Sequence, residues 1–548
     1  MKKIINYCRT NYDVLVFVIC VLLFPFLFAF GASNSDITQR IWSNILYACI
    51  ILCILLCTKN RLRKIIAFGI TIISFVPNMI VQSYLLMDKV IMKSTDFWVI
   101  FNTDFTEATN LFSTLKPNVL FFGILYTLLV ISSFILIFRK SDNKHSSPIA
   151  LQIFSIIILF GVSLVNPFRS KVPMIDFYKS YWKYNREQRD VAEFYKNRQD
   201  LILDVQSTFP EGKNTLLIII GESQNKTHMQ LYGYPRTTSP LLMEIKDELA
   251  IYNDVCSPAI HTLSCMKQIL TFTNYEQPDM YKKEANIIEL LHFGGYKTFW
   301  FDNQGEDKNG AFAIDTYTPT SYRTMAKRSD VYNSTGKPND SIIIGALEMA
   351  LQDTTAHKAI FLHLVGNHFD YSNRYEPSFA FFNDTTDINS PYLHLLSEQD
   401  IEKINAYDNA TRYNDYIVRT CIEKIRTKEG RCAMLYLSDH GEEIFDYQNY
   451  CSRSFEKISP AMCEIPLILW MNEEYRNSCD LTLEINRPTC TDDIIHGIMD
   501  LAQIKYTLYD STRSVFHPAY YPKERKVENI PLNDIRKKYQ QTIAQSPL

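Results

Sequence analysis

The sequence lacks several features that would place it in a common class of protein. It has no long basic block, and its 56 lysines and arginines are set against 59 acidic residues for a net charge of −3. This balance gives no reason to expect a nucleic-acid partner. The sequence also contains no internal repeat and no low-complexity segment, which excludes a repeat array. At 548 residues, the chain is too long for one ordinary domain.

Charge is scarce in long stretches of the first third of the chain. The first apolar stretch follows basic residues as a signal peptide would, but it is long and lacks a small-x-small cleavage site, so we expect an uncleaved helix. The second stretch needs Ile41 to Ser43 to reach the roughly 20 residues of a membrane span. We therefore predict five transmembrane helices. The apolar runs are Val14 to Phe30, Ile45 to Cys57, Ile65 to Leu86, Val119 to Phe138 and Ile149 to Val165.

Basic residues fall on one side of a five-helix arrangement. They precede the first run, separate the second from the third, and separate the fourth from the fifth. Because positive loops stay in the cytoplasm, the C-terminal part is expected in the periplasm of a bacterial inner-membrane protein. The residues are Lys2, Lys3, Arg9, Lys59, Arg61, Arg63, Lys64, Arg139, Lys140 and Lys144.

Eight of the thirteen cysteines lie beyond the apolar runs. Their even number and short gaps make pairing of neighbours plausible in an oxidising compartment. The alternative is eight free core thiols in a cytosolic domain. The expected disulfides are Cys256–Cys265, Cys421–Cys432, Cys451–Cys463 and Cys479–Cys490.

Three parts are expected along the chain: a transmembrane domain over residues 1–166, a linker over 167–210 and a soluble domain over 211–548. The linker is rich in aromatic and charged residues, which favours interfacial helices at the headgroup zone. The alternative is a connector that packs on the soluble domain. Its aromatic residues include Phe177, Tyr178, Tyr181, Trp182, Tyr184, Phe194 and Tyr195.

Short apolar strands alternate with helices from Thr215 onward. This pattern predicts an α/β sandwich with a largely parallel sheet, whose active site lies beyond the carboxyl ends of the strands. The predicted strands are Thr215 to Gly221, Lys297 to Phe301, Ala359 to Val365, Ala433 to Leu437 and Ile465 to Trp470. The predicted helices include Asn286 to His292, Ser341 to Leu351 and Ala406 to Arg426.

Polar residues that could bind a metal follow two of these strands. Glu222 comes directly after the first strand, and Asp439 and His440 come after the fourth. A hard oxygen and a borderline nitrogen donor together suit zinc, and Gly441 would permit a tight turn. The alternative is a pair of helix-capping turns.

Two further segments supply candidate residues for the chemistry. Thr262 lies in a short loop, where a hydroxyl beside a metal can lose its proton and attack phosphorus. After the third predicted strand, His368 is the better candidate for the site. His363, by contrast, is interpreted as a strand residue satisfied by a local hydrogen bond.

Motifs in a fixed order carry a resemblance to a known family. The chain resembles the phosphoethanolamine transferases that modify lipid A and the lipopolysaccharide core, including colistin-resistance forms, of the alkaline phosphatase and sulfatase superfamily. The resemblance covers the whole chain, since that family also has five N-terminal helices before a periplasmic domain. The motifs are Gly221-Glu222-Ser223 with His228, Leu231-Tyr232-Gly233-Tyr234, Thr262 before Ser264-Cys265-Met266, Gly366-Asn367-His368, Tyr407-Asp408-Asn409 and Ser438-Asp439-His440-Gly441-Glu442.

The resemblance implies a role for each matching residue. Zn²⁺ would be held by Glu222, Thr262, Asp439 and His440, with Thr262 taking the phosphoethanolamine covalently. Substrate contacts would come from His368, Lys308, Thr103 and Glu107, the last two facing the site across the membrane boundary. The alternative for His368 is a contact with a second zinc ion. For Lys308 and Glu107 the alternative is a solvated surface charge.

The chain departs from the family in two places. Lipid A-modifying members often have a further histidine about a dozen residues after the Asp-His pair, but Tyr447 to Ser454 contains none. Val99 stands where an asparagine would be expected. The first departure weakly favours a core acceptor over lipid A.

Three other functions compete with this interpretation. Cys256-Ser257-Pro258-Ala259 resembles the start of the sulfatase motif, but Ile260 stands where that motif has arginine. A glycerol phosphate transferase and an inactive membrane scaffold are the other two. The expected reaction is a double displacement in which Thr262 takes phosphoethanolamine from phosphatidylethanolamine and passes it to a lipopolysaccharide acceptor.

Overall fold

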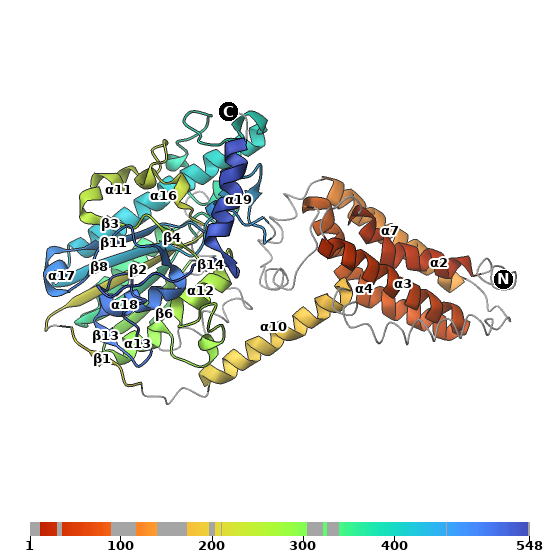
Figure 1. The fold of residues 1–548 in the computed structure, drawn as a ribbon, viewed down its shortest axis with the longest axis horizontal. Coiled ribbons are helices and arrows are strands. Elements are labelled where there is room, and N and C mark those ends of the chain that lie inside the picture. Colours follow the sequence, from red (N-terminus) through yellow and green to blue (C-terminus); the bar gives the residue numbers. More distant parts are fainter. Residues whose placement is uncertain are drawn as a thin grey trace. The chain divides into compact units, whose positions relative to one another are not determined.

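Two units make up the chain, residues 1–189 and 190–548. The structure is a computed structural model that describes residues 11–29, 35–88, 117–139, 172–196, 203–209, 211–303, 322–325, 339–455 and 457–545 (Figure 1). The first unit is helical. Its elements are α2 (Tyr12–Val18), the π-helix η1 (Ile19–Leu23), the 3-10 helix η2 (Phe24–Ala29), α3 (Ser35–Cys57), α4 (Asn60–Asp88), α7 (Pro117–Arg139) and most of α10 (Pro173–Lys196).

Three helices in the described part of this unit are long and apolar enough to cross a membrane: Gln39–Cys57, Arg61–Ser83 and Pro117–Arg139. They correspond to the second, third and fourth predicted spans. The first predicted span contains a shorter apolar helix, Tyr12–Leu27. The fifth, Ile149 to Val165, lies outside the described residues.

A proline explains why the first apolar helix changes form. Pro25 has no backbone N–H, so an α-helix through it would leave the carbonyl of Val21 without its usual donor. Two side chains supply that bond: Asn78 Nδ2 donates at 2.8 Å and the Tyr126 hydroxyl donates at 2.9 Å. In an apolar environment an unpaired carbonyl is costly. These two polar residues therefore fix the first helix to α4 and α7.

A side chain from another helix also satisfies the backbone carbonyl left unpaired by the proline inside α4. Pro77 cannot donate to the carbonyl of Ile73, and the Tyr178 hydroxyl of α10 donates to that oxygen at 3.0 Å. Tyr178 belongs to the aromatic segment predicted to be a linker, so at least one of its aromatics anchors α10 to α4. The hydrogen bond joins residues 105 positions apart in the sequence.

We expect Tyr126→Phe to destabilise the helical unit. The substitution removes one of the two donors to the Val21 carbonyl, and such bonds between membrane helices contribute about 1 kcal/mol. Thermal unfolding in detergent should show a lower Tm than wild type. Tyr521→Phe is the matched control, because this side chain is 75% exposed. An unchanged Tm in Tyr126→Phe would show that Asn78 alone satisfies the carbonyl.

The second unit contains a seven-stranded sheet in the order β3-β11-β8-β2-β7-β5-β6. Its strands are β2 (Asn214–Gly221), β3 (Leu249–Ile251), β5 (Lys297–Asp302), β6 (Tyr322–Met325), β7 (His357–His363), β8 (Arg431–Ser438) and β11 (Leu467–Met471). Neighbours from β8 to β6 are parallel, whereas β11 is antiparallel to both β8 and β3. The prediction of a largely parallel sheet is confirmed.

Short strands and helices complete the second unit. The strands outside the main sheet are β1 (Gln206–Ser207), β4 (Val255–Cys256), β9 (Glu443–Ile444), β10 (Cys451–Ser452), β12 (Thr489–Cys490), β13 (Ile504–Lys505), β14 (Lys526–Val527) and β15 (Ile530–Pro531). The helices are α11 (Pro240–Glu244), α12 (Thr262–Leu270), α13 (Ile287–Phe293), α15 (Ser341–Gln352), α16 (Glu398–Arg426), α17 (Glu473–Ser478), α18 (Ile494–Ala502) and α19 (Leu532–Gln545).

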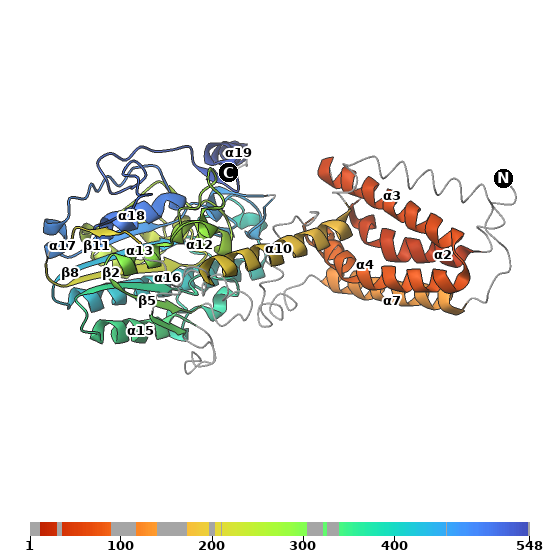
Figure 2. The ribbon, with the colours of Figure 1, turned by 90° about the horizontal axis from the view of Figure 1, so that it is seen from below.

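Helices cover both faces of the sheet, and each face has its own apolar core (Figure 2). Along β2, Leu216, Ile218 and Ile220 pack toward α12, α13 and α18. Leu217 and Ile219 pack toward α15 and α16 on the other face. Side chains that alternate between two buried faces give the continuous apolar run seen in the sequence. The sheet edge carrying the carboxyl ends of these strands is thereby held rigid.

The five predicted strands all occur, with shifts of one or two residues at their ends. One predicted helix starts too late: α16 begins at Glu398 rather than at Ala406. Its N-cap, Ser397, accepts from the Asp400 backbone N–H, and Asp400 in turn accepts from the Ser397 N–H. This reciprocal capping box stabilises a polar first turn that carries no apolar periodicity.

The predicted disulfides are wrong: all eight cysteines of the second unit are free. The thiol of Cys265 instead donates to the Ala259 carbonyl at 3.3 Å. Cys256 faces Cys490 across the parallel pair β4 and β12 rather than Cys265. Cys421 and Cys432 are buried in the core between the sheet and α16, where a free cysteine behaves as a small apolar residue.

Candidate metal and nucleophile site

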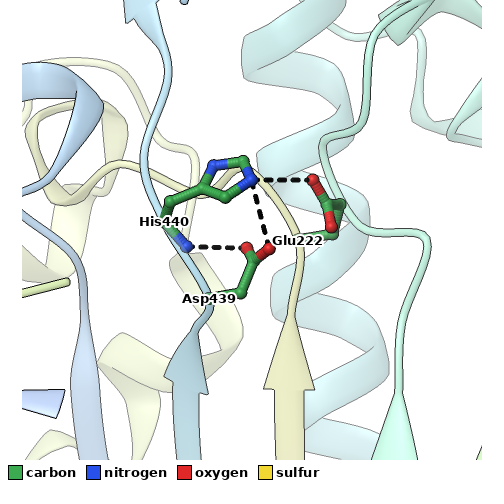
Figure 3. Close-up of side chains that lie close together, drawn as sticks. All are labelled: Glu222, Asp439 and His440. Carbon is green, nitrogen blue, oxygen red and sulfur yellow. Dashed lines mark hydrogen bonds and ion pairs between the residues drawn. The ribbon is translucent and has the colours of Figure 1, made fainter. Parts of the chain in front are cut away.

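Three candidate ligands meet where two neighbouring strands end. Glu222 follows β2, while Asp439 and His440 follow β8 (Figure 3). All three side chains are completely buried, and one ligand atom from each lies within 4.8 Å of the others. His440 Nε2 lies 3.3 Å from Glu222 Oε1 and 3.1 Å from Asp439 Oδ2. The register of β2 against β8, which pairs Gly221 with Ser438, places them side by side.

Thr262 joins this cluster from a different part of the fold. It is the first residue of α12, and its hydroxyl Oγ1 lies 3.0 Å from Glu222 Oε2 and 3.3 Å from His440 Nε2. The first N–H groups of a helix have no intrahelical acceptor, and the helix dipole makes this end positive. An anion attached to Oγ1 would therefore lie at a favourable helix terminus.

The two buried carboxylates have opposite pKa shifts. Burial raises the pKa of Asp439 well above its ordinary value, and the neighbouring Glu222 raises it further. Burial alone would raise the pKa of Glu222 as well, but electrostatic interactions with His440, His368 and Arg453 hold it below its ordinary value. Two carboxylates this close repel each other when both are ionised, so the site favours a bound cation.

The imidazole of His440 has one defined orientation. Nδ1 lies 2.9 Å from the Gly441 carbonyl, which can only accept, so Nδ1 carries the proton and Nε2 faces the cluster as a lone pair. Burial, and secondarily Arg453, lower the pKa of His440 to about 3. Gly441 is required here because a Cβ would lie 2.1 Å from the Ala461 carbonyl oxygen.

The turn after β2 holds Glu222 in place through a strained backbone. Ser223 has a φ of +56°, in the left-handed region that non-glycine residues rarely occupy. The Tyr407 hydroxyl donates to the Ser223 carbonyl at 2.6 Å and accepts from the Asn225 N–H at 3.0 Å. On the other side Gly366, with φ +47°, packs so closely that a Cβ would lie 2.8 Å from the Glu222 carbonyl oxygen.

A buried ion network supports the same turn from α16. Asp408 accepts a 2.6 Å contact from His228 Nδ1, a 3.0 Å hydrogen bond from Tyr234 and a 2.8 Å bond from Arg236. His228 Nε2 also lies 3.4 Å from Asp446. His228, Tyr234 and Asp408 belong to three of the motifs identified in the sequence, whereas Arg236 and Asp446 belong to none. They position the site and do not enter it.

Of the other residues predicted from the sequence, the structure describes the two histidines but not the remaining three. His368 lies near the cluster, since it lowers the pKa of both Glu222 and His440. His363 is confirmed as a strand residue with a local partner, because its Nδ1 lies 3.1 Å from Asp302. Lys308, Thr103 and Glu107 lie outside the described residues.

Two charged residues of the site, Arg453 and Glu442, were not predicted from the sequence. Arg453 Nη1 lies 2.5 Å from His440 Nε2, and Arg453 Nε lies 3.0 Å from Glu442 Oε2. Glu442 belongs to one of the sequence motifs without an assigned role, and Arg453 lies in the stretch from Tyr447 to Ser454 that lacks the family's further histidine. A buried glutamate needs a cationic partner, which is the one signal that could have indicated an arginine nearby.

In the sulfatase-like segment, the cysteine is not the residue that contacts the cluster. Cys256 is completely buried on β4, in an apolar cluster with Cys463 and Cys490. Thr262 is the residue of this segment that contacts Glu222 and His440. The hydroxyl of Thr262 thus lies at the cluster, while the thiol of Cys256 packs in an apolar core.

Comparisons with known proteins agree with this arrangement. The sequence profile of the sulfatase family matches residues 214–504. The chain is similar to phosphoethanolamine transferase EptC of Escherichia coli strain K12, with 28% identity over 365 residues that cover 64% of this chain and 62% of the relative. The alignment thus spans less than two thirds of that relative's length.

Two solved structures are similar to the chain. One is the C-terminal periplasmic domain of EptC from Escherichia coli in complex with Zn, with 28% identity, a TM-score of 0.55, and coverage of 59% of this chain and 92% of that one. The other is the integral membrane protein lipooligosaccharide phosphoethanolamine transferase A from Neisseria meningitidis, with 16% identity, a TM-score of 0.69, and coverage of 93% and 98%. The second shows a shared fold that extends into the helical unit. The chain belongs to the sulfatase family.

The ion network predicts a pH dependence of stability. Burial alone would lower the pKa of His228, but Asp446 and Asp408 raise it to about 10 from the ordinary 6.5. A folded-state pKa above the unfolded value stabilises the fold fully below about pH 6.5. That contribution is lost as the pH rises toward 10.

Between about pH 7 and pH 9, the free energy of unfolding should fall by up to about 1.4 kcal/mol per pH unit through this histidine. His228→Gln should lower stability at neutral pH and flatten the slope, as measured by thermal unfolding across that range. His394→Gln, at an exposed histidine, should keep the wild-type slope. A wild-type slope in His228→Gln would contradict the assignment.

Proposed function

We propose that the protein is a zinc-dependent phosphoethanolamine transferase. It takes phosphoethanolamine from phosphatidylethanolamine through Thr262 and transfers it to a lipopolysaccharide acceptor, a core sugar or lipid A. The observation that carries this proposal is the contact of a threonine hydroxyl at a helix N-terminus with a buried Glu-Asp-His cluster. The relatives named phosphoethanolamine transferase support the group that is transferred.

The donor atoms of the cluster fit a zinc ion. His440 presents a lone pair at Nε2, and Asp439 Oδ2 is buried without a hydrogen-bond donor among the described residues. Electron-rich atoms that face one another in this way need a cation between them. Glu222, Thr262, Asp439 and His440 would hold the ion, and one similar structure is of a zinc complex. When bound, zinc lowers the pKa of a coordinated hydroxyl and offsets charge on phosphoryl oxygens.

Protein groups would carry out the other steps of the reaction, which are proton transfer, stabilisation of the phosphoryl group and substrate binding. Glu222 Oε2 accepts the hydrogen bond of the Thr262 hydroxyl and is placed to take its proton as Oγ1 bonds to phosphorus. The N-terminus of α12 stabilises the phosphoryl group once it is on Oγ1. The lipid leaves as diacylglycerol, and an acceptor oxygen then displaces Oγ1 from phosphorus. His368 and Lys308 would contact the phosphoethanolamine group.

The enzyme would lie in the bacterial inner membrane with residues 211–548 in the periplasm, where lipid donor and lipopolysaccharide are both at hand. Three long apolar helices support the membrane location, and the charge bias of the loops supports the orientation. Holding the enzyme in the bilayer restricts the search for donor to two dimensions. Thr103 and Glu107, between the third and fourth spans, would contact the lipid headgroup.

A lipid-turnover assay tests the proposal. The full-length protein in detergent is given head-group-labelled phosphatidylethanolamine, and diacylglycerol release is measured. We expect zinc-dependent release that a chelator stops and that zinc restores. Thr262→Ala should reduce release by at least about a thousandfold, as removal of a nucleophile does. It should leave Tm unchanged within about 2 °C, a shift of less than about 1 kcal/mol.

Two further samples complete the assay. Thr354→Ala, at an exposed threonine, should release diacylglycerol at the wild-type rate. Glu222→Gln should lower the zinc content measured by elemental analysis. Release that persists in Thr262→Ala would remove the proposed nucleophile. Cleavage of a sulfate ester in place of phosphatidylethanolamine would assign the chain to a different reaction.

A further inference from the structure

A hairpin brings an arginine back to the cluster from outside the main sheet. β9 begins one residue after Glu442, and β10 returns antiparallel to it, with Ser452 opposite Glu443. Ser452 has a φ of +128°, a conformation that L-residues rarely adopt. Arg453 follows directly, so this bend directs its side chain back over the site.

The guanidinium of Arg453 is held by two separate segments, the turn that contains His440 and Glu442 and the loop that contains Ile260. Nε lies 3.0 Å from Glu442 Oε2, and Nη1 lies 3.2 Å from the Ile260 carbonyl oxygen and 2.5 Å from His440 Nε2. Only 14% of the side chain is exposed. Ile260 precedes Thr262 by two residues, so the same contact ties the arginine to the nucleophile's loop.

The position of Nη1 relative to the nucleophile follows from two distances. His440 Nε2 lies 2.5 Å from Nη1 and 3.3 Å from Thr262 Oγ1. Nη1 and Oγ1 can therefore be no farther apart than the sum of these distances. Within that separation, a non-bridging oxygen of a phosphoryl group bonded to Oγ1 can accept a charged N–H···O bond of about 2.7–2.9 Å from Nη1.

A further observation indicates that Arg453 does more than neutralise the charge of Glu442. Its Nη2 atom has no hydrogen-bond partner among the described residues. A guanidinium whose only function was to neutralise Glu442 would normally pair both nitrogens of its fork with the carboxylate. Here Nε lies 3.0 Å from Glu442 Oε2, whereas Nη1 contacts His440 Nε2 and the Ile260 carbonyl oxygen.

We propose that Arg453 is a catalytic residue that binds a non-bridging oxygen of the phosphoryl group at Thr262. The inference rests on the proposed function and deepens it by naming a phosphate-binding residue. In phosphoryl transfer, negative charge develops on the non-bridging oxygens, and a planar guanidinium matches them. The Oγ1–P bond forms as the P–O bond to diacylglycerol breaks, and diacylglycerol takes the electron pair and the proton released by the Thr262 hydroxyl. Arg453 donates hydrogen bonds and keeps all its protons.

Binding of inorganic phosphate tests this role without turnover. Zinc-loaded full-length protein in detergent is titrated with inorganic phosphate by calorimetry. Arg453→Met should weaken binding by at least about tenfold, in line with the loss of one charged hydrogen bond. Arg453→Lys should lie between the two, because it keeps the charge but not the fork. Arg426→Met, which removes an arginine paired with Glu248 at 2.7 Å, should bind as wild type.

Removing Arg453 alone leaves the Glu442 carboxylate buried without its partner, which could unfold the protein. The titration is therefore repeated with the double variant Glu442→Gln/Arg453→Met. We expect it to keep the wild-type zinc content and Tm and to bind phosphate as weakly as Arg453→Met. Zinc lost from both the double variant and Arg453→Lys would overturn the inference and show that Arg453 only supports the metal ligands.

Turnover supplies the second measurement. In Arg453→Met, kcat for diacylglycerol release should fall by about 100-fold, comparable to the loss of one donor to a developing charge, while KM changes by less than about threefold. Wild-type phosphate affinity in Arg453→Met, or no phosphate binding by wild type, would overturn the inference. Arginine-dependent phosphate binding in a wild type that releases no diacylglycerol would instead refute the proposed function and leave the phosphate site standing.

Discussion

The repulsion between two buried carboxylates is the constraint on which the site depends. Glu222 and Asp439 are both fully buried and both lie within reach of His440 Nε2. Their charges can coexist only with positive charge nearby. A zinc ion on the donor atoms and the guanidinium of Arg453 are the two sources available. The metal content and phosphate affinity that we predict depend on how this charge is balanced.

Many residues of the second unit fix the positions of the charged side chains in the cluster. Tyr407 stabilises the strained turn at Ser223, and Gly366 permits close packing on Glu222. The network around Asp408 connects the same turn to α16. Many of the motif residues therefore support the cluster through contacts within the protein. They keep the ligands in one geometry, which phosphoryl transfer requires because positioning and electrostatics supply most of its rate.

The sequence predicted those features that depend on local pattern. Apolar runs gave the strands, and polar residues at their ends gave Glu222, Asp439 and His440, since parallel strands bring their carboxyl ends to one edge. Arg453 could not be found in this way. A hairpin brings it to the site, and its partner Glu442 became informative only when its burial was known. The disulfide prediction failed because sequence gaps do not report that Cys256 faces Cys490 across two strands.

The most direct test is to locate the covalent group. The full-length protein, loaded with zinc, is incubated with phosphatidylethanolamine in the absence of an acceptor, digested, and examined by peptide mass spectrometry. The account predicts phosphoethanolamine on the hydroxyl of Thr262. It also predicts loss of that modification when a lipopolysaccharide acceptor is added. A phosphoethanolamine group on another residue, or diacylglycerol release with an unmodified Thr262 peptide at every time point, would contradict the central claim.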